Sequence, residues 1–99
     1  MEIKLVSREN EGELLLIGKL DSQSAPGAEK LIMEAASKFD RIILNLAKLE
    51  YTASAGLRVI KTLQSYMDSK DGELLIKNVN ERVMEVLEMT GFASFLKFI

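Results

Sequence analysis

Residues 41–63 read RIILNLAKLEYTASAGLRVIKTL and join two different apolar patterns. The first, from Arg41 to Leu46, is a short apolar run with β-branched residues, which predicts a strand buried on both faces. The second predicts a helix, because its apolar residues recur on one helical face. These residues are Leu57, Ile60, Leu63 and Met67. A buried strand that leads into an amphipathic helix is typical of an α/β protein.

Two short apolar runs precede this segment, at Ile3–Val6 and Leu14–Ile17. The charged cluster between them, residues 9–13, predicts a hairpin turn of about five to seven residues. The two runs are therefore expected to form an antiparallel pair of strands.

A helix is expected next, over residues 24 to 37. Ser24 is placed to act as its N-cap, and Pro26 falls in the first turn, where its missing N–H is harmless. The expected apolar face consists of Ala28, Leu31, Ile32, Ala35 and Phe39.

The C-terminal third predicts a strand, a helix and a final short strand. The first strand is expected at Leu74–Ile76, after a glycine-containing turn. Asn78 and Glu81 resemble a capping box at the start of the helix, and Gly91 suits the position after its end. The apolar face of this helix consists of Val79, Val83, Val86, Leu87 and Thr90. Residues 95–99 predict the terminal strand.

The expected order of elements is therefore β-β-α-β-α-β-α-β in one domain, residues 1–99. Strands that alternate with helices require crossovers, so most neighbours in the sheet are parallel, while the opening hairpin makes the sheet mixed. We expect an α/β fold in which about three to four helices pack on a mixed, mostly parallel sheet.

Composition excludes several classes of function. The chain has no Cys and no His, which removes thiolate chemistry, the commonest general base and the commonest transition-metal ligand. Its net charge of −2 argues against nucleic acid as a partner. We find no phosphate-binding glycine loop and no cluster of metal ligands, and so expect no metal and no cofactor. Apolar runs of four residues do not span a membrane, so a cytoplasmic location is the default.

The junction from Leu49 to Arg58 is the segment best suited to a function. Small residues gather there, at Ala53, Ala55 and Gly56, so another molecule can approach the backbone closely. Ser54 lies at or near a helix N-terminus, where free amides and the helix dipole favour an anion, including a phosphate on the serine itself. The alternative is that Ser54, or Thr52, acts only as an N-cap.

This junction resembles the signature of STAS domains, the family of bacterial anti-sigma factor antagonists. The family carries Asp-Ser-(Ser/Thr/Ala)-Gly-Leu at the start of its second helix, and this chain has Ala53-Ser54-Ala55-Gly56-Leu57. Three further segments are similar to family patterns in the same order. They are Gly18-Lys19-Leu20-Asp21 after the second strand, the strand Ile42–Leu46, and Leu87-Glu88-Met89-Thr90-Gly91 at the end of the third helix.

The resemblance implies a regulatory switch and not an enzyme. Family members bind an anti-sigma factor that is also a serine kinase, the kinase phosphorylates one serine, the complex dissociates, and a phosphatase resets the system. By position that serine is Ser54, and Asp21 matches the acidic residue near it. The implied contact surface comprises Asp21, Ala53, Ala55, Gly56, Leu57 and Arg58.

Three departures from the family pattern keep a second interpretation open. Ala53 and Asn45 stand where the family usually has Asp, and Arg58 stands where Gly is frequent. A STAS protein without phosphorylation remains the alternative, as an accessory subunit of, for example, a transport complex or as a ligand-binding module. A neighbouring kinase or phosphatase gene favours the switch, and transporter genes favour the alternative. A small enzyme is disfavoured, because no base stands at a motif-defined spacing from Ser54.

Overall fold

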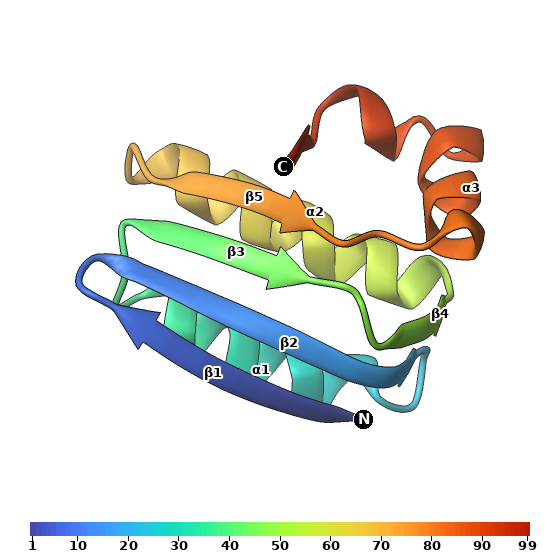
Figure 1. Ribbon diagram of the computed structural model, residues 1–99, viewed down its shortest axis with the longest axis horizontal. Helices are drawn as coiled ribbons and strands as arrows, with labels where there is room; N and C mark the ends of the chain where they lie inside the picture. The colour runs from blue at the N-terminus through green and yellow to red at the C-terminus, as the bar shows by residue number, and fades with distance from the viewer.

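The computed structural model describes the whole chain, residues 1–99, as a twisted sheet with two long helices behind it (Figure 1). The strands are β1 (Glu2–Arg8), β2 (Glu11–Leu20), β3 (Arg41–Asn45), β4 (Leu49–Thr52), β5 (Glu73–Lys77) and β6 (Lys97–Phe98). The helices are α1 (Ala25–Ala36), α2 (Ser54–Ser69) and α3 (Glu81–Met89), followed by the 3₁₀ turn η1 (Phe92–Ser94).

The strand order is β1-β2-β3-β5-β6. Strand β1 is antiparallel to β2, and all other neighbours are parallel, so the predicted mixed, mostly parallel sheet is confirmed. Strand β2 is long enough to pair twice: its first half pairs with β3 and its last residues pair with β4. The carboxyl ends of β2 and β4 therefore meet at one end of the sheet, and α2 begins there (Figure 1).

One contiguous core lies between the sheet and the helices α1 and α2, and it extends to Val83 and Leu87 of α3. The predicted helical face of α2 is buried, and Leu63 and Met67 have no exposed surface. Strand β3 is buried on both faces, as expected, because Ile42, Ile43 and Leu44 are all buried in succession. Burial of this apolar surface is the main force that holds the fold together.

Strand β4 was not predicted. The segment from Leu49 to Thr52 was expected to be a connection between a strand and a helix. It forms a strand because β2 extends past the end of β3 and leaves backbone groups that β4 can pair with. Leu49 and Thr52 of β4 are buried and the two residues between them are exposed. This pattern departs from strict alternation because the register with β2 shifts between Leu49 and Tyr51.

The predicted hairpin turn was too long. Glu9 and Asn10 alone form it, and Glu9 has a positive φ of 49°. Residues 11–13 remain extended because they pair with residues 41–43 of β3. Gly12 leaves room for the Phe39 ring, since a Cβ there would lie 2.7 Å from it and the ring would have to shift.

Two of the residues predicted to form the apolar face of α1 do not belong to it. Leu31 is 52% exposed, and Phe39 lies beyond the end of the helix at Ala36. The helix starts after Ser24, but the Ser24 side chain does not cap it. Its hydroxyl instead donates to the carbonyl of Lys19 at 2.8 Å.

The C-terminal elements also differ in detail. The N-cap of α3 is Asn80, whose side chain accepts from the Val83 amide at 2.8 Å, so the predicted pair of Asn78 and Glu81 was wrong. Gly91 follows the C-cap with a φ of 82°, as expected. The predicted strand over residues 95–99 shortens to the two residues of β6.

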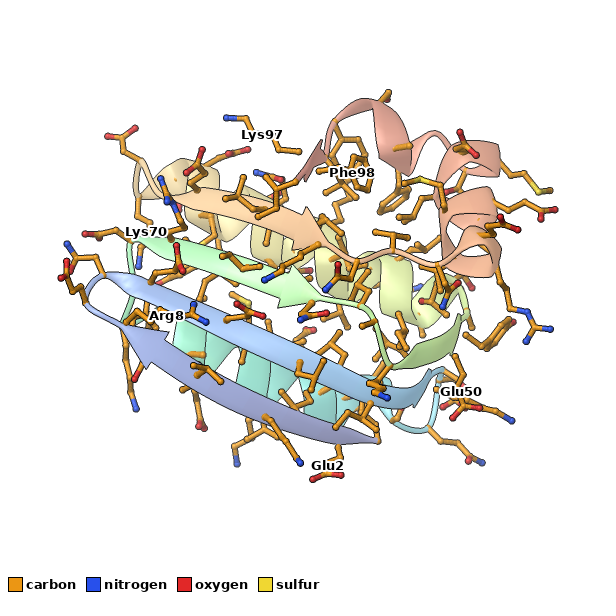
Figure 2. All side chains as sticks on the ribbon, viewed as in Figure 1. Glu2, Arg8, Glu50, Lys70, Lys97 and Phe98 are labelled. Carbon is orange, nitrogen blue, oxygen red and sulfur yellow. The ribbon has the colours of Figure 1, made fainter.

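The face of the sheet opposite the helices carries charged side chains, and Figure 2 shows Arg8 lying across β2. Glu13 is the centre of this network: it accepts from Asn45 Nδ2 at 2.9 Å and lies within 3.6 Å of the Lys77 ammonium. The hydrogen bond from Asn45, together with the charges of Lys77 and Arg8, lowers the pKa of Glu13 below 4.5, against the opposing effect of burial. None of the helices is both long and apolar enough to cross a membrane.

Candidate functional site

The start of α2 lies at the carboxyl end of β4. Thr52, the last strand residue, is buried, and Ala53 is the N-cap with extended backbone at φ −96° and ψ 178°. Ser54 is the first helical residue and is exposed. Neither Ser54 nor Thr52 is therefore the N-cap, and the interpretation of Ser54 as a cap alone does not hold.

No side chain caps α2. Because Ala53 is the N-cap, the helix lacks the oxygen that Ser, Thr, Asp or Asn supplies at that position. The amides of Gly56 and Leu57 both donate to the Ala53 carbonyl, at 2.9 and 3.2 Å. The first amides of a helix have no intrahelical acceptor, and the first turn of α2 contains no acidic residue. The site can therefore accept an anion.

Gly56 and Leu57 form the buried side of the first turn of α2. Both are buried, and Leu57 is 5% exposed. A Cβ at Gly56 would lie 2.7 Å from Leu20 Cγ and would collide with Thr52 Oγ1. The small size of Gly56 thus lets α2 pack on the ends of β2 and β4, which sequence reasoning had attributed to the approach of a partner.

Arg58 is exposed, while Ala53 and Ala55 are half-buried. Together with Ser54 they form the outer surface at the start of α2. Of the six residues predicted to contact a partner, Ala53, Ala55, Arg58 and Asp21 reach the surface.

Asp21 occupies the turn between β2 and α1. Its Oδ1 accepts from the amides of Gln23 and Ser24, both at 3.0 Å. The pKa of Asp21 is lowered, first by the Ser24 amide and then by the Gln23 amide, because both hydrogen bonds favour the charged carboxylate. In the free protein this carboxylate is therefore engaged in the turn that leads into α1.

Asp21 and Ser54 are joined through the backbone. The Ala53 amide donates to the Leu20 carbonyl at 2.9 Å, and Leu20 is in register with Thr52. Asp21 follows Leu20, and Ser54 follows Ala53, so each predicted residue is the direct neighbour of one end of this hydrogen bond. The structure therefore brings the two segments of the predicted site together.

Two hollows are lined by residues of the predicted site. One, of about 560 Å³, lies between α1 and α2 and has Ala55 and Arg58 on one wall. Its other wall is formed by residues of α1 and the preceding turn: Ser22, Ala25, Pro26, Glu29 and Lys30. The second, of about 460 Å³, lies beside the turn that holds Asp21 and also includes Lys19 and Glu50.

Sequence reasoning missed the contribution of α1 to this surface. Glu29 and Lys30 line the hollow beside Arg58, but they are distant from it in the chain and carry no motif. In the sequence, the only indication that Glu29 and Lys30 reach this surface is their polar character within a predicted helix. A third hollow, lined by Arg8, Asp40 and Arg41 among other polar residues, lies at the hairpin end of the sheet, away from Ser54.

Asn45, one of the departures from the family pattern, is engaged elsewhere. Its amide nitrogen donates to Glu13, and its oxygen accepts from the Ala47 backbone at 3.1 Å. An aspartate at this position would place a second carboxylate against Glu13. Asn45 is therefore explained by the charged face of the sheet and not by the environment of Ser54.

Residues 2–99 match the STAS domain family model. A Bordetella bronchiseptica protein with the provisional name anti-sigma factor antagonist BtrV is 36% identical over 75 residues. This match covers 72% of the present chain and 65% of the length of that relative.

Two solved structures share the fold. An anti-sigma factor antagonist from Mycobacterium paratuberculosis superposes with a TM-score of 0.89 at 14% identity, covering 98% of this chain and 83% of that one. The Bacillus cell fate determinant SpoIIAA in its phosphorylated form gives 0.77 at 17% identity, covering 99% and 91%. The match over nearly the whole sequence and the shared fold agree, and the chain belongs to the STAS domain family and is similar to its anti-sigma factor antagonists.

Proposed function

We propose that this protein binds an anti-sigma factor that is also a serine kinase, and that phosphorylation of Ser54 ends the binding. The observation that carries the proposal is the exposed Ser54 at the uncapped start of α2. The similarity to anti-sigma factor antagonists supports the class of partner. The proposed function is capture of a partner and not catalysis, and it takes place in the cytoplasm.

The surface around Ser54 is suited to close contact. Ala53 and Ala55 flank the serine with small side chains, so a partner can reach the hydroxyl without displacing a long neighbour. Gly56 and Leu57 beneath them hold the helix start against the sheet, which keeps this surface in one position. A preorganised surface loses little conformational entropy on binding.

Phosphorylation changes this surface without requiring a change in fold. A phosphate adds a charge of about −1.5 to −2 and three acceptor oxygens. The open amides and dipole of α2 favour that charge in the free protein by about 0.3–1 kcal/mol. A partner surface that fits a neutral hydroxyl must desolvate the charge, which costs far more than the dipole returns. Since about 1.4 kcal/mol is tenfold in affinity, a few kcal/mol suffice to separate the complex.

Asp21 adds to the effect. Its carboxylate lies in the segment that is hydrogen-bonded to the start of α2, and its pKa, which lies below 3.8, means that it is charged at neutral pH, as an ordinary aspartate is. A second negative group on Ser54 therefore adds to a negative charge already present on this surface. A serine phosphatase then restores the binding form.

The test uses four forms of the protein as baits in a lysate of the source organism: wild type, Ser54→Ala, Ser54→Asp and Ser65→Asp. Ser65 is an exposed serine in the middle of the same helix, so it controls for the added charge. We expect wild type, Ser54→Ala and Ser65→Asp to retain the same kinase, and Ser54→Asp to lose it. Incubation of the captured complex with ATP should phosphorylate wild type at Ser54 and leave Ser54→Ala unmodified.

Equal capture of the same proteins by all four baits would contradict the switch. That outcome would favour the alternative of a constitutive STAS subunit, and the identity of the captured proteins would name its complex. Phosphorylation at another residue would place the switch elsewhere on the chain.

A further inference from the structure

The two edges of the sheet differ greatly in length. Strand β6 ends one edge with two residues, whereas β1 ends the other with the seven residues from Glu2 to Arg8. All seven pair with β2 in unbroken register, with no bulge. Neither proline nor a bulge interrupts β1, so its outer backbone groups can pair with another strand.

The side chains of β1 are poorly buried. Six of the seven residues are exposed, and Leu5 and Val6 are 48% and 50% exposed. Leu5 lies opposite Leu14, a core residue, so Leu5 is on the helix-covered side of the sheet. Glu2, Lys4, Val6 and Arg8 alternate with it and lie on the open side.

We propose that β1 pairs antiparallel with β1 of a second copy of this chain, about a two-fold axis at Leu5. In this register each Leu5 faces the other, and Glu2 lies opposite Arg8 of the second copy at both ends of the ladder. Figure 2 shows that Glu2 and Arg8 lie at opposite ends of β1, as this pairing requires. Opposite charges directly across from each other stabilise a strand pair.

The alternative registers are less favourable. A shift that centres the pair on Lys4 places two lysines opposite each other, and one centred on Val6 places Lys4 opposite Arg8. A shift by a single residue is not possible, because it would place Leu5, on the helix-covered side, opposite Val6, on the open side, whereas directly opposed residues of an antiparallel pair lie on the same face. Charge therefore selects the Leu5-centred register.

The dimer is expected to be weak. A pair of short strands buries much less than the roughly 1,600 Å² of a typical stable interface. We expect a dissociation constant on the order of 100 µM, which increasing salt weakens because the end contacts are ion pairs. This surface lies on the edge of the sheet and involves no residue of the α2 site, so its test is independent of the proposed function.

Cysteine trapping provides the sharpest test, because the chain contains no native cysteine. Directly opposed residues in an antiparallel pair have Cα atoms about 4.5 or 5.5 Å apart, and both distances suit a disulfide. We expect Leu5→Cys to form a disulfide-linked dimer under mild oxidation. Leu31→Cys, on a leucine of similar exposure in α1, is the control and should remain largely monomeric. No linkage at Leu5, or equal linkage at both positions, would overturn the proposal.

The register is tested with two more variants, Glu2→Cys and Arg8→Cys. An equal mixture should form mixed dimers well in excess of dimers of either variant with itself. A merely statistical distribution would overturn the register.

Sedimentation measures the association without a covalent link. Wild type is expected to shift from monomer to dimer between micromolar and millimolar concentration. Leu5→Asp should abolish the shift by opposing two carboxylates at the axis, while Leu31→Asp should leave it unchanged. A wild-type chain that stays monomeric at millimolar concentration would overturn the proposal. Thermal melting checks that both variants are folded.

Discussion

Helices α2 and α3 differ in how their N-terminal turns are capped. At α3, Asn80 caps the first turn through Val83, donates to the Leu49 carbonyl at 2.7 Å, and is followed by an acidic residue. At α2, Ala53 supplies no side-chain cap and the first turn has no acidic residue. The Asn80 side chain accepts from one amide in the first turn of α3, whereas no side chain accepts from an amide in the first turn of α2.

The difference shows where the stability of each start comes from. A good N-cap contributes about 1 kcal/mol, and α2 lacks that contribution. The start of α2 is instead held from beneath by Gly56 and Leu57, which pack on the ends of β2 and β4. A helix start that is held by its buried side can leave its outer side free for another molecule.

The largest expected effect comes from removing that buried support. Leu57→Ala should lower the free energy of unfolding by about 2–5 kcal/mol, because it removes a buried side chain and leaves a cavity. Denaturant unfolding measures the change. Leu31→Ala, at a leucine that is 52% exposed, is the control and should change stability by about 0.5 kcal/mol or less. Equal losses in the two variants would mean that the α2 start is not held from beneath.

The second effect tests the capped helix. Asn80→Ala should destabilise the protein by about 2 kcal/mol, because it removes both the cap on Val83 and the hydrogen bond to the Leu49 carbonyl. Asn80→Ser should recover part of this loss, since a serine can cap the helix but is too short to replace the second contact. Thermal unfolding compares the three proteins, and a neutral Asn80→Ala would remove the contrast between the two helices.

The third prediction concerns adding a side-chain N-cap to α2. Ala53→Asp should raise the free energy of unfolding by about 1 kcal/mol, because Ala53 already has the extended backbone of an N-cap. Ala53→Asn supplies the same cap without a charge and separates capping from repulsion by Asp21. If neither variant is more stable than wild type, the amides of α2 are not available to an outside acceptor.

The fourth effect concerns the serine itself. Ser54→Asp should stabilise the folded protein by only about 0.3–1 kcal/mol, because a carboxylate in the first turn interacts favourably with the helix dipole. Ser65→Asp, in the middle of the helix, should show no such gain. The melting temperatures of the two variants and wild type measure the difference. A marked destabilisation by Ser54→Asp would contradict an exposed Ser54 at an uncapped helix start.

The smallest effect is the pH dependence of the turn before α1, where the titratable Asp21 carboxylate accepts two backbone hydrogen bonds. The pKa of Asp21 in the folded protein lies below its ordinary value of 3.8, so its contribution to stability is complete above that pH. The contribution disappears as the pH falls through the folded pKa. NMR titration of the carboxyl should give a midpoint below 3.8, and Asp21→Asn should remove this part of the acid dependence. A midpoint at or above 3.8 would show that the turn does not hold the carboxylate.

Most of the architecture could be predicted from local pattern. The alternation of apolar runs with helical periodicity predicted every strand except β4 and all three helices, because burial imposes its own spacing on each element. The turn chemistry was less predictable. Glu11 and Glu13 read as turn residues since they are charged, yet they lie in β2, where their carboxylates meet arginines and Asn45 on the open face.

The family pattern predicted which segments form the candidate site, but not what each residue does there. Gly56 and Leu57 were expected at a contact surface, and they are buried. Asp21 was expected beside the serine, and its carboxylate caps the turn before α1. A linear motif records which residues are adjacent in the chain, and it does not record which side of a helix faces the core.

The sequence by itself determined the class of fold, the strand-to-helix junction at Ser54 and the absence of histidine and cysteine chemistry, because periodicity and composition are properties of the chain. Only the tertiary structure decided that β2 pairs with both β3 and β4, and that the Ala53 amide donates a hydrogen bond to the Leu20 carbonyl. It also decided that β1 is left as a long, unpaired edge of the sheet. These features depend on pairing between segments distant in sequence. Backbone hydrogen bonds make such pairings, and all residues except proline offer the same backbone groups, so side-chain pattern alone does not specify them.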